Sequence, residues 1–492
     1  MLFYKHKTFS GVDFSREIFF RHTITDRSCV AFNVVKGEKF MNQTYMREKK
    51  VLPLVLSMSL PMVISMAVNS LYNIVDSFFV AKLSEEAMTA LALVYPVQNL
   101  INSIAVGFGI GINVNAAFYL GADDRNRADQ AVSQGIILNT IHGVLLTVLC
   151  IGGMPWFLRM FTSDNEIIES ALIYSNRAFV FSVIITLGIS FEKIFQSVGK
   201  MKISMFSMMC GFIVNIILDP LMIFGIGFFP AMGIAGAAYA TGIGQCVSLF
   251  VYLIFYIIRP IPVKIKRQCL RPEKQVIAKL YSVGIPATIN MALPSLLISA
   301  LNGILSEVSE KYVLVLGVYY KLQTFIYLTA NGIIQGIRPL IGYNYGAGEY
   351  GRVKKIYHAT MNLTLIVMAA GTALSWLMPE TLIGLFTSNA ETVRIGVTAL
   401  HMISLGFIVS AVSVTCSGAL EGLGKGVPSL YISLLRYVVI IIPAAFIFSR
   451  WMEAEGVWLA FGFTELISGG LAYVIYKKNY TGIKIRESEG KD

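Results

Sequence analysis

The chain has 492 residues, of which 55% are hydrophobic and only 14% carry a charged side chain, and its formal net charge is +11. A soluble domain has about 25% charged residues, so this composition excludes a soluble globular protein and favours one whose surface faces lipid. The positive charge does not indicate nucleic-acid binding, because Lys and Arg gather in short loops between apolar segments.

The first 45 residues differ from the rest of the chain. They are polar, mixed in charge and without the apolar core of a signal peptide. Residues 1–45 are therefore expected to be either a disordered cytoplasmic tail or sequence upstream of a true start at Met41 or Met46. The second alternative is favoured, because Met46-Arg-Glu-Lys-Lys is an ordinary basic lead-in to a membrane helix.

Twelve long apolar segments follow, each near the ~20 residues that cross a bilayer. They must be helices, because lipid offers no hydrogen-bond partner to the backbone. The fold class is thus an all-α membrane protein. We place the segments at 51–80, 88–118, 133–155, 167–192, 203–228, 233–258, 279–305, 312–341, 357–378, 393–420, 428–448 and 456–476.

The loops alternate in charge along the chain. One set is basic and includes the stretch 259–274, whereas the opposite set carries acidic residues such as Glu85, Asp164 and Glu453. Basic loops stay in the cytoplasm. We therefore expect a multi-pass protein of the cell membrane (inner or plasma) with both termini cytoplasmic.

The chain repeats itself at a constant shift. Phe161-Thr-Ser recurs as Phe386-Thr-Ser, and the same shift takes Pro61 to Pro286 and Gly107 to Gly332. Two homologous six-helix bundles result, and an even number of helices makes them parallel repeats. The predicted divisions are 1–45 (extension), 46–258 (first bundle), 259–279 (cytoplasmic connector), 280–478 (second bundle) and 479–492 (cytoplasmic tail).

Ionisable groups within membrane helices are costly and default to functional candidates. Asp76 and Asp219 lie in apolar segments, Asn215 shares a helix face with Asp219, and Thr241 follows in the next segment. At ~1.5 Å per residue, they lie at comparable depth. Their oxygen atoms are suitable ligands for a small monovalent cation such as Na⁺. Alternatives are one proton shared between the carboxylates, or a structural role with unrelated polar partners.

The second bundle lacks this set, since the repeat shift converts Asp76 to Leu301 and Asp219 to Ala444. The ion site is therefore expected in the first bundle only. Glu192, beside Lys193, is a possible secondary acidic site or an interfacial pair. Pro61 and Pro286 are expected to act as hinges.

Other charged residues near the membrane are not expected to form functional sites. Arg338 and Glu421 approach cytoplasmic helix ends, where lipid headgroup contact is expected. The six cysteines are dispersed, and no P-loop, HExxH or GxSxG motif occurs, so we expect neither an enzyme nor an ATP-driven pump. We expect no cofactor, and no metal beyond Na⁺ at the cation site.

The chain resembles the multidrug and toxic compound extrusion (MATE) family over about residues 46–478. Three motifs of the first half carry the resemblance: Asn73-Ile-Val-Asp76, Asn215-Ile-Ile-Leu-Asp219-Pro220 and Gly233-Ile-Ala-Gly-Ala-Ala-Tyr-Ala-Thr241. Two of the second half add to it: Pro339-Leu-Ile-Gly-Tyr-Asn344 and Ser433-Leu-Leu-Arg436.

The resemblance implies two bundles arranged as a V that export organic cations by antiport with Na⁺ or H⁺. It also implies that Asp76, Asn215, Asp219 and Thr241 bind the coupling ion. Some members use acidic residues in helices 7 and 10 instead. Helix 7 has apolar Met291 and Leu297 in that region here, which puts such a site in doubt.

The predicted function is therefore multidrug efflux, by a monomer that binds small organic, mainly cationic, compounds. One alternative is a lipid-linked oligosaccharide flippase of the same superfamily, which would need a strongly cationic cavity. Another is a non-transport membrane protein such as a receptor.

Removing residues 1–40 is expected to leave membrane insertion and transport unchanged, because the segment precedes a self-sufficient first helix. Expression level and dye efflux of the truncated and full-length chains would be compared in the same cells. A truncated chain that no longer inserts would contradict this expectation.

Overall fold

The computed structural model describes residues 44–489, with side chains described through residue 480. Most of the predicted N-terminal extension, residues 1–45, therefore lies outside the described residues. Between residues 44 and 489 the chain is helical, with turns and no strands. A short helix, α2 (Tyr45–Glu48), precedes the first long one.

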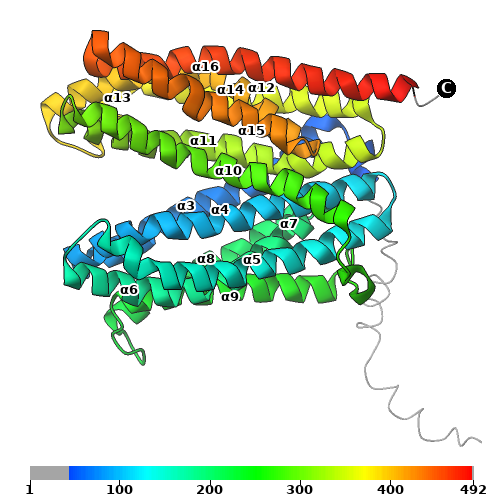
Figure 1. Cartoon of the computed structure of the whole chain (residues 1–492), viewed down its shortest axis with the longest axis horizontal. Coiled ribbons are helices and arrows are strands. Elements are labelled where there is room, and N and C mark those ends of the chain that lie inside the picture. Colours follow the sequence, from blue (N-terminus) through cyan, green and yellow to red (C-terminus); the bar gives the residue numbers. More distant parts are fainter. Residues whose placement is uncertain (1–43, 490–492) are drawn as a thin grey trace, which may run out of the picture. The chain divides into compact units, whose positions relative to one another are not determined.

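The first bundle, which we call the first lobe, supplies six membrane spans. Its helices are α3 (Val51–Ala81), α4 (Glu85–Gly121), α5 (Arg125–Arg159), α6 (Asn165–Val180), α7 (Ser182–Ser197), α8 (Met201–Phe224) and α9 (Ile234–Ile258). Helices α6 and α7 are one span broken at Phe181 with a bend of 44°. The blue to green helices in Figure 1 form this lobe.

The second bundle, or second lobe, follows a short 3₁₀ turn, η1 (Arg267–Leu270). Its elements are α10 (Lys274–Ser306), α11 (Glu310–Gly346), α12 (Tyr350–Leu377), α13 (Pro379–Gly384), α14 (Ala390–Gly422), α15 (Gly426–Leu434), the π-helix η2 (Leu435–Ile440) and α16 (Ile441–Glu489). They run from green to red in Figure 1.

The spans of the described chain total twelve. Ten helices are long and apolar enough to cross a membrane, and the bent pair α6–α7 adds an eleventh span. The run Gly426–Tyr480 supplies two, because α16 is kinked at Met452 and Glu453, where Glu453 adopts a φ of 49°. The predicted all-α membrane fold with two homologous six-helix bundles is confirmed.

The repeat is visible in local structure as well as in sequence. Ser84 and Ser309, which the repeat shift relates, cap the N-termini of α4 and α11, and Asp164 and Asn389 do the same for α6 and α14. Each capping oxygen accepts an N–H that would otherwise be unpaired. The two halves of the sequence thus begin equivalent helices with equivalent chemistry.

Glycines bring the two lobes into backbone contact. A Cβ on Gly107 of α4 would overlap Thr288 of α10, and one on Gly332 of α11 would overlap Val63 of α3. Small residues permit such close helix approach. The two contacts are equivalent, since the repeat shift that takes Gly107 to Gly332 also takes Val63 to Thr288. The lobes therefore meet about a local two-fold axis.

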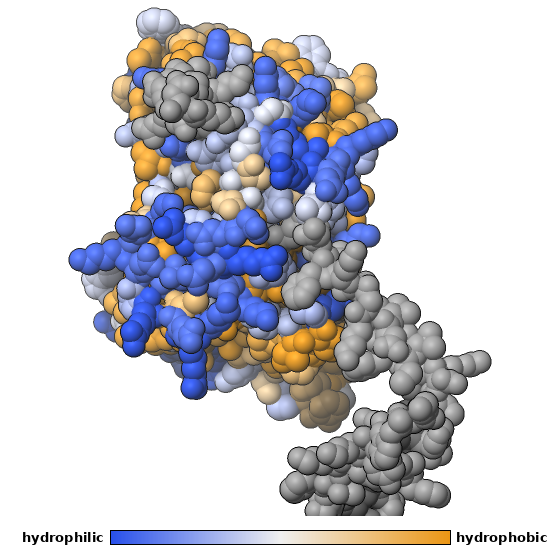
Figure 2. Space-filling model, turned by 90° about the vertical axis from the view of Figure 1, so that its right-hand side faces the viewer, coloured by the Kyte–Doolittle hydropathy of each residue, from blue (hydrophilic) through white to orange (hydrophobic). Residues whose placement is uncertain are grey.

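The lobe contacts lie toward the ends of the helices that carry the basic loops. An added Cβ on Gly121 would overlap the Tyr343 carbonyl oxygen, and one on Gly346 that of Phe118. Figure 2 looks onto this end and shows hydrophilic residues over both lobes. We call this end the basic face.

The connector between the lobes lies on α5 at the basic face. Asp129 forms a 2.6 Å ion pair with Lys266, and Gln134 Nε2 donates to the Arg271 carbonyl oxygen at 2.8 Å. The hydrogen bond and the charge of Asp129 raise the pKa of Lys266 above its usual value. These contacts bind the connector to the first lobe up to the start of α10.

Replacing Gly121 or Gly346 by Val is expected to separate the lobes at the basic face, because the new side chain meets backbone atoms that cannot yield. The reaction of a Ser59→Cys thiol with a water-soluble maleimide, in a cysteine-free background, should become several-fold faster. Ser59 packs against Gly336 of the second lobe. Gly152→Val is the control, since nothing lies within 4 Å of that position. Unchanged labelling in both variants would show that the contact does not hold the lobes together.

Candidate functional site: unpaired carboxylates in the first lobe

Three neighbouring helices of the first lobe carry the predicted site residues. Asp76 lies near the end of α3, Asn215 and Asp219 lie one turn apart on α8, and Thr241 is on α9. Helix α8 contacts both α3 and α9. Pro220 follows Asp219 within α8 and removes one backbone donor from that turn.

The structure brings the α8 and α9 residues into direct contact. The Asn215 amide Nδ2 lies 3.3 Å from Asp219 Oδ1 and 3.3 Å from Thr241 Oγ1. Asp219 is fully buried, and Asn215 and Thr241 are buried with it. The amide thus donates to two oxygens and fixes them side by side.

Asp76 faces the same region from α3. Its side chain is buried, and its charge interacts with that of Asp219. Tyr72, one turn before Asp76, stacks on Phe212 of α8 with ring centroids 5.0 Å apart. Sequence analysis missed Tyr72, although its spacing of four from Asp76 places both on one helix face.

Charge balance distinguishes these aspartates from every other buried carboxylate among residues 44–480. Six are buried: Asp76, Asp129, Glu192, Asp219, Glu421 and Glu465. Four of the six form ion pairs, with Lys266, Lys193, Arg338 and Arg436. Asp76 and Asp219 have no basic partner among the described side chains.

The buried oxygen atoms of the site also lack donors. Asp76 Oδ1, Asn215 Oδ1 and Asp219 Oδ2 are buried and accept no hydrogen bond from the described chain. Buried acceptors without a partner are costly. Carboxylate and amide oxygens are ligands that hard cations prefer. The residues therefore fit a small monovalent cation, and they would equally hold a proton.

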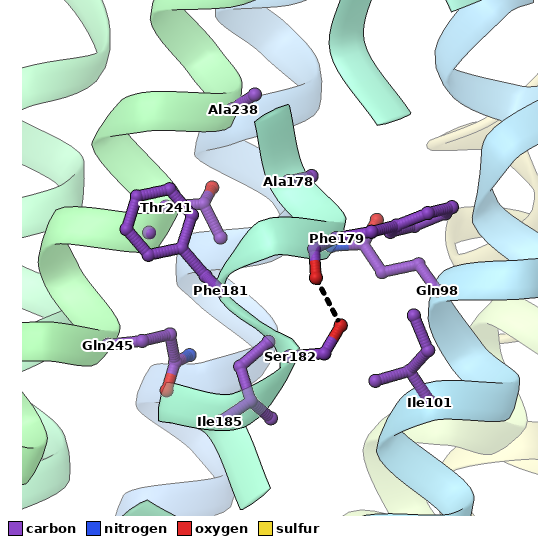
Figure 3. Close-up of a pocket in the computed structure, with 11 residues that line it drawn as sticks. Gln98, Ile101, Ala178, Phe179, Phe181, Ser182, Ile185, Ala238, Thr241 and Gln245 are labelled. Atoms are coloured by element: carbon purple, nitrogen blue, oxygen red, sulfur yellow. Dashed lines mark hydrogen bonds between the residues drawn. The ribbon is translucent and has the colours of Figure 1, made fainter. Parts of the chain in front are cut away.

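A small cavity of about 10 Å³ adjoins Thr241, which is room for one water molecule. Gln98, Ser182, Thr241 and Gln245 provide its polar lining, beside the break between α6 and α7 (Figure 3). Phe181 at the break packs against Gly242, where a Cβ would overlap its ring. Thr241 therefore both lines this cavity and accepts from Asn215.

Glu192 lies elsewhere. Lys193 Nζ donates to Glu192 Oε1 at 2.8 Å and to Gln335 Oε1 of the second lobe at 3.4 Å. Both charged residues are buried, so the interfacial interpretation of Glu192 is wrong. Glu192 belongs to the contact between the lobes and is not part of the Asp76–Asp219 site.

Arg338 and Glu421 also pair with each other rather than with headgroups. Arg338 Nη2 lies 2.7 Å from Glu421 Oε2, and Asn290 Nδ2 donates to Glu421 Oε1 at 3.1 Å. The expectation of lipid contact was wrong, because the two side chains satisfy each other inside the second lobe.

The proposed hinge prolines lie within unbroken helices. Pro61 is in α3 and Pro286 is in α10, and both are buried. Ser65 Oγ donates to the Pro61 carbonyl at 2.9 Å. Their role as hinges stays a prediction.

Comparison with known proteins gives consistent matches. The MatE family model matches residues 61–221 and 286–447, one match in each lobe. The multidrug export protein MepA of Staphylococcus saprophyticus is 24% identical over 432 residues, which cover 88% of this chain and 94% of that protein. MepA of Staphylococcus aureus is 23% identical over 414 residues, covering 84% and 90%.

Solved structures share the fold. One, described as an outward-facing multidrug resistance MATE family transporter of the MOP superfamily, has a TM-score of 0.85 and 24% identity over 91% of this chain and all of that one. A MOP superfamily transporter from Pyrococcus furiosus, described as having a binding pocket of reversed polarity, has a TM-score of 0.84 and 23% identity over the same shares.

Replacing Thr241 by Val is expected to lower the affinity for Na⁺ about tenfold, because one ligand oxygen and one acceptor for Asn215 are lost, at ~1.4 kcal/mol. Binding of radioactive Na⁺ to the purified chain would measure this. Thr364→Val is the control, since Thr364 is also buried but lies in the second lobe and donates to the Thr360 carbonyl. Equal losses in both variants would count against Thr241 as a ligand.

Proposed function

Because the chain belongs to the MatE family and is a multi-pass membrane transporter, we propose that it exports small organic compounds, mainly cations, by exchange with Na⁺ or H⁺. The observation that carries this proposal is the pair of buried aspartates that no Lys or Arg among the described residues neutralises. The MepA relatives, named as multidrug export proteins, support the direction and the substrate class.

The charge balance supplies the coupling. Two carboxylates within a membrane lobe are strongly disfavoured unless a cation or a proton joins them. An ion shifts a conformational equilibrium only by its difference in affinity for the two states. Asp76 is on α3, whereas Asn215 and Asp219 are on α8, so any movement of α3 against α8 changes the ligand set. Ion binding and lobe conformation are thereby linked.

The lobe contacts supply the access step. We infer that the basic face is cytoplasmic, since short basic loops remain on that side. The glycine contacts then close the cytoplasmic side in this conformation. Export requires a second conformation in which these contacts separate. One chain contributes both lobes, so we propose that a monomer is sufficient.

The flippase alternative is less well supported. A pathway for an anionic lipid-linked sugar needs unneutralised basic side chains. Lys193, Arg338 and Arg436 are buried or half-buried in the lobes, and each is paired with a glutamate. Arg177 of α6 is half-buried without a carboxylate partner among the described residues; it donates to the Ile173 carbonyl and lies over the Tyr239 ring.

Asp76→Asn and Asp219→Asn are each expected to lower ion-driven efflux by roughly tenfold or more, since each removes a charge worth at least ~1.4 kcal/mol to ion binding. The measurement is export of a fluorescent organic cation from vesicles, driven separately by a Na⁺ gradient and by a pH gradient. Asp123→Asn is the control, because its carboxylate is exposed at the basic face. Native rates with either gradient in an Asp76 or Asp219 variant would refute the assignment.

A further inference from the structure

The second lobe contains a buried charged cluster that the proposed exchange does not use. Arg436 Nη2 lies 2.6 Å from Glu465 Oε1, and Arg436 Nε donates to the same oxygen at 2.7 Å. Nη2 also donates to the Tyr327 hydroxyl at 2.9 Å, and Nη1 to the Tyr437 hydroxyl at 3.2 Å. The Arg436 guanidinium thus makes four polar contacts, which fix its position in the second lobe.

The cluster lies deep in the membrane. Arg436 is 6% exposed and Glu465 is 9% exposed. Arg436 is ten residues from the start of α15 at Gly426, which is ~15 Å at ~1.5 Å per residue and close to the centre of a hydrocarbon layer of ~30 Å. Charges at this depth are rare and mark functional positions.

The backbone is irregular at this point. Arg436 lies in the π-helix η2 (Leu435–Ile440), which joins α15 to α16. Single π turns inside α-helices are frequently found at functional sites. The wider turn changes the direction of the side chains that follow it, and it presents Arg436 to Glu465 on the second part of α16.

The repeat places this cluster where the first lobe has its oxygen site. The repeat shift, applied in reverse, takes Arg436 to Gly211, one turn before Asn215 on α8, and takes Glu465 to Ala240, which precedes Thr241 on α9. Conversely, the counterparts of Asp76 and Asp219 are Leu301 and Ala444, both in the apolar core of the second lobe. The same pair of helices thus carries a polar centre in each lobe.

The two centres differ in how their charge is balanced. In the first lobe, two carboxylates have no basic partner. In the second lobe, one carboxylate has a guanidinium held against it by its own chain. We propose that Glu465 and its neighbours form a second monovalent-cation site, and that the tethered guanidinium of Arg436 is its permanent cation.

This proposal explains an unpaired atom and a glycine. Glu465 Oε2 is buried and has no hydrogen-bond donor among the described residues, as a carboxylate shared with a larger cation would. Gly406 of α14 packs against Glu465, where a Cβ would lie 3.2 Å from Glu465 Cγ. The absence of a side chain at Gly406 therefore lets α14 pack closely against Glu465.

A tethered cation makes the second lobe insensitive to ions, because the charge is balanced in every conformation. Only the first lobe then responds to Na⁺ or H⁺. Without the tethered charge, Glu465 would be buried and unneutralised, which destabilises the lobe, and a free cation of the same charge and size that enters the site should restore stability.

The test uses the purified full chain with Asp76→Asn and Asp219→Asn, so that the first lobe does not respond to ions. Arg436→Ala is added to this background, which leaves Glu465 and a space of guanidinium size. Millimolar guanidinium chloride is expected to raise its Tm by about 1–2 °C or more, measured against choline chloride at equal ionic strength. The Tm of the background chain, which keeps Arg436, should not rise when guanidinium is added.

Two controls isolate Glu465. Adding Glu465→Gln to the Arg436→Ala chain should abolish the guanidinium response, because no charge remains to be balanced. Arg450→Ala, which removes an exposed arginine instead, should show no response. A Tm that guanidinium leaves unchanged or lowers in the Arg436→Ala chain, or a rise that persists without Glu465, would overturn the proposal.

Lowering the pH is a second probe of the same charge, since a proton also neutralises Glu465. The titratable groups around it are Arg436, Tyr327 and Tyr437, with Tyr319 and Tyr320 behind them. Stabilisation on going from pH 8.5 to pH 6 is thus expected in the Arg436→Ala chain and not after Glu465→Gln.

If Arg436→Ala does not fold, Arg436→Lys keeps the proposal testable. A lysine retains a tethered charge, so the chain should be recovered and show no guanidinium or Na⁺ response. An Arg436→Lys chain that is stabilised by either ion would contradict the proposal. Transport does not enter these measurements, so their outcome is separate from that of the proposed exchange.

Discussion

A carboxylate buried in a membrane lobe must have its charge balanced, and this one requirement organises both lobes. Glu192, Glu421 and Glu465 are each balanced by a Lys or Arg of their own lobe. An unpaired charge at such a site costs several kcal/mol, so these pairs are costly to break. Asp76 and Asp219 are the exceptions among the described residues, and the proposed exchange rests on their imbalance.

The repeat provides the second constraint, because it gives both lobes one backbone plan. Helix caps at Ser84 and Ser309 and close contacts at Gly107 and Gly332 recur at the same shift. A shared plan does not require shared chemistry, however. The polar centres have diverged into two carboxylates in one lobe and a carboxylate with a guanidinium in the other. Two lobes with the same backbone plan can therefore respond differently to the same ion.

The sequence predicts most of the fold, since lipid leaves a long apolar segment no alternative to a helix. The helix ends were less predictable: the segment predicted at 133–155 is part of α5 (Arg125–Arg159), because polar turns outside the hydrocarbon do not stop a helix. The break at Phe181 carries no Pro or Gly signal. The Arg436–Glu465 pair was not predicted, although Arg436 belongs to a motif that carries the family resemblance, because the two residues are 29 positions apart and a π-helix places Arg436. The rarity of charges in segments 428–448 and 456–476 was the available signal.

The balance of charge within each lobe also decides how easily the lobes can separate. Hydrogen bonds between the lobes include Ser59 Oγ to the Ile333 carbonyl and Asn115 Nδ2 to the Lys279 carbonyl. Two lysines also donate across the lobes: Lys279 to the Tyr119 hydroxyl, and Lys193, which Glu192 already neutralises, to Gln335. Each such bond contributes about 1 kcal/mol net. The ion pair across the lobes, Arg47 with Glu349, is exposed and worth ~0–1 kcal/mol. Separation therefore leaves no buried charge unpaired, and an ion whose affinity differs between the two states by a few kcal/mol is enough to shift the equilibrium.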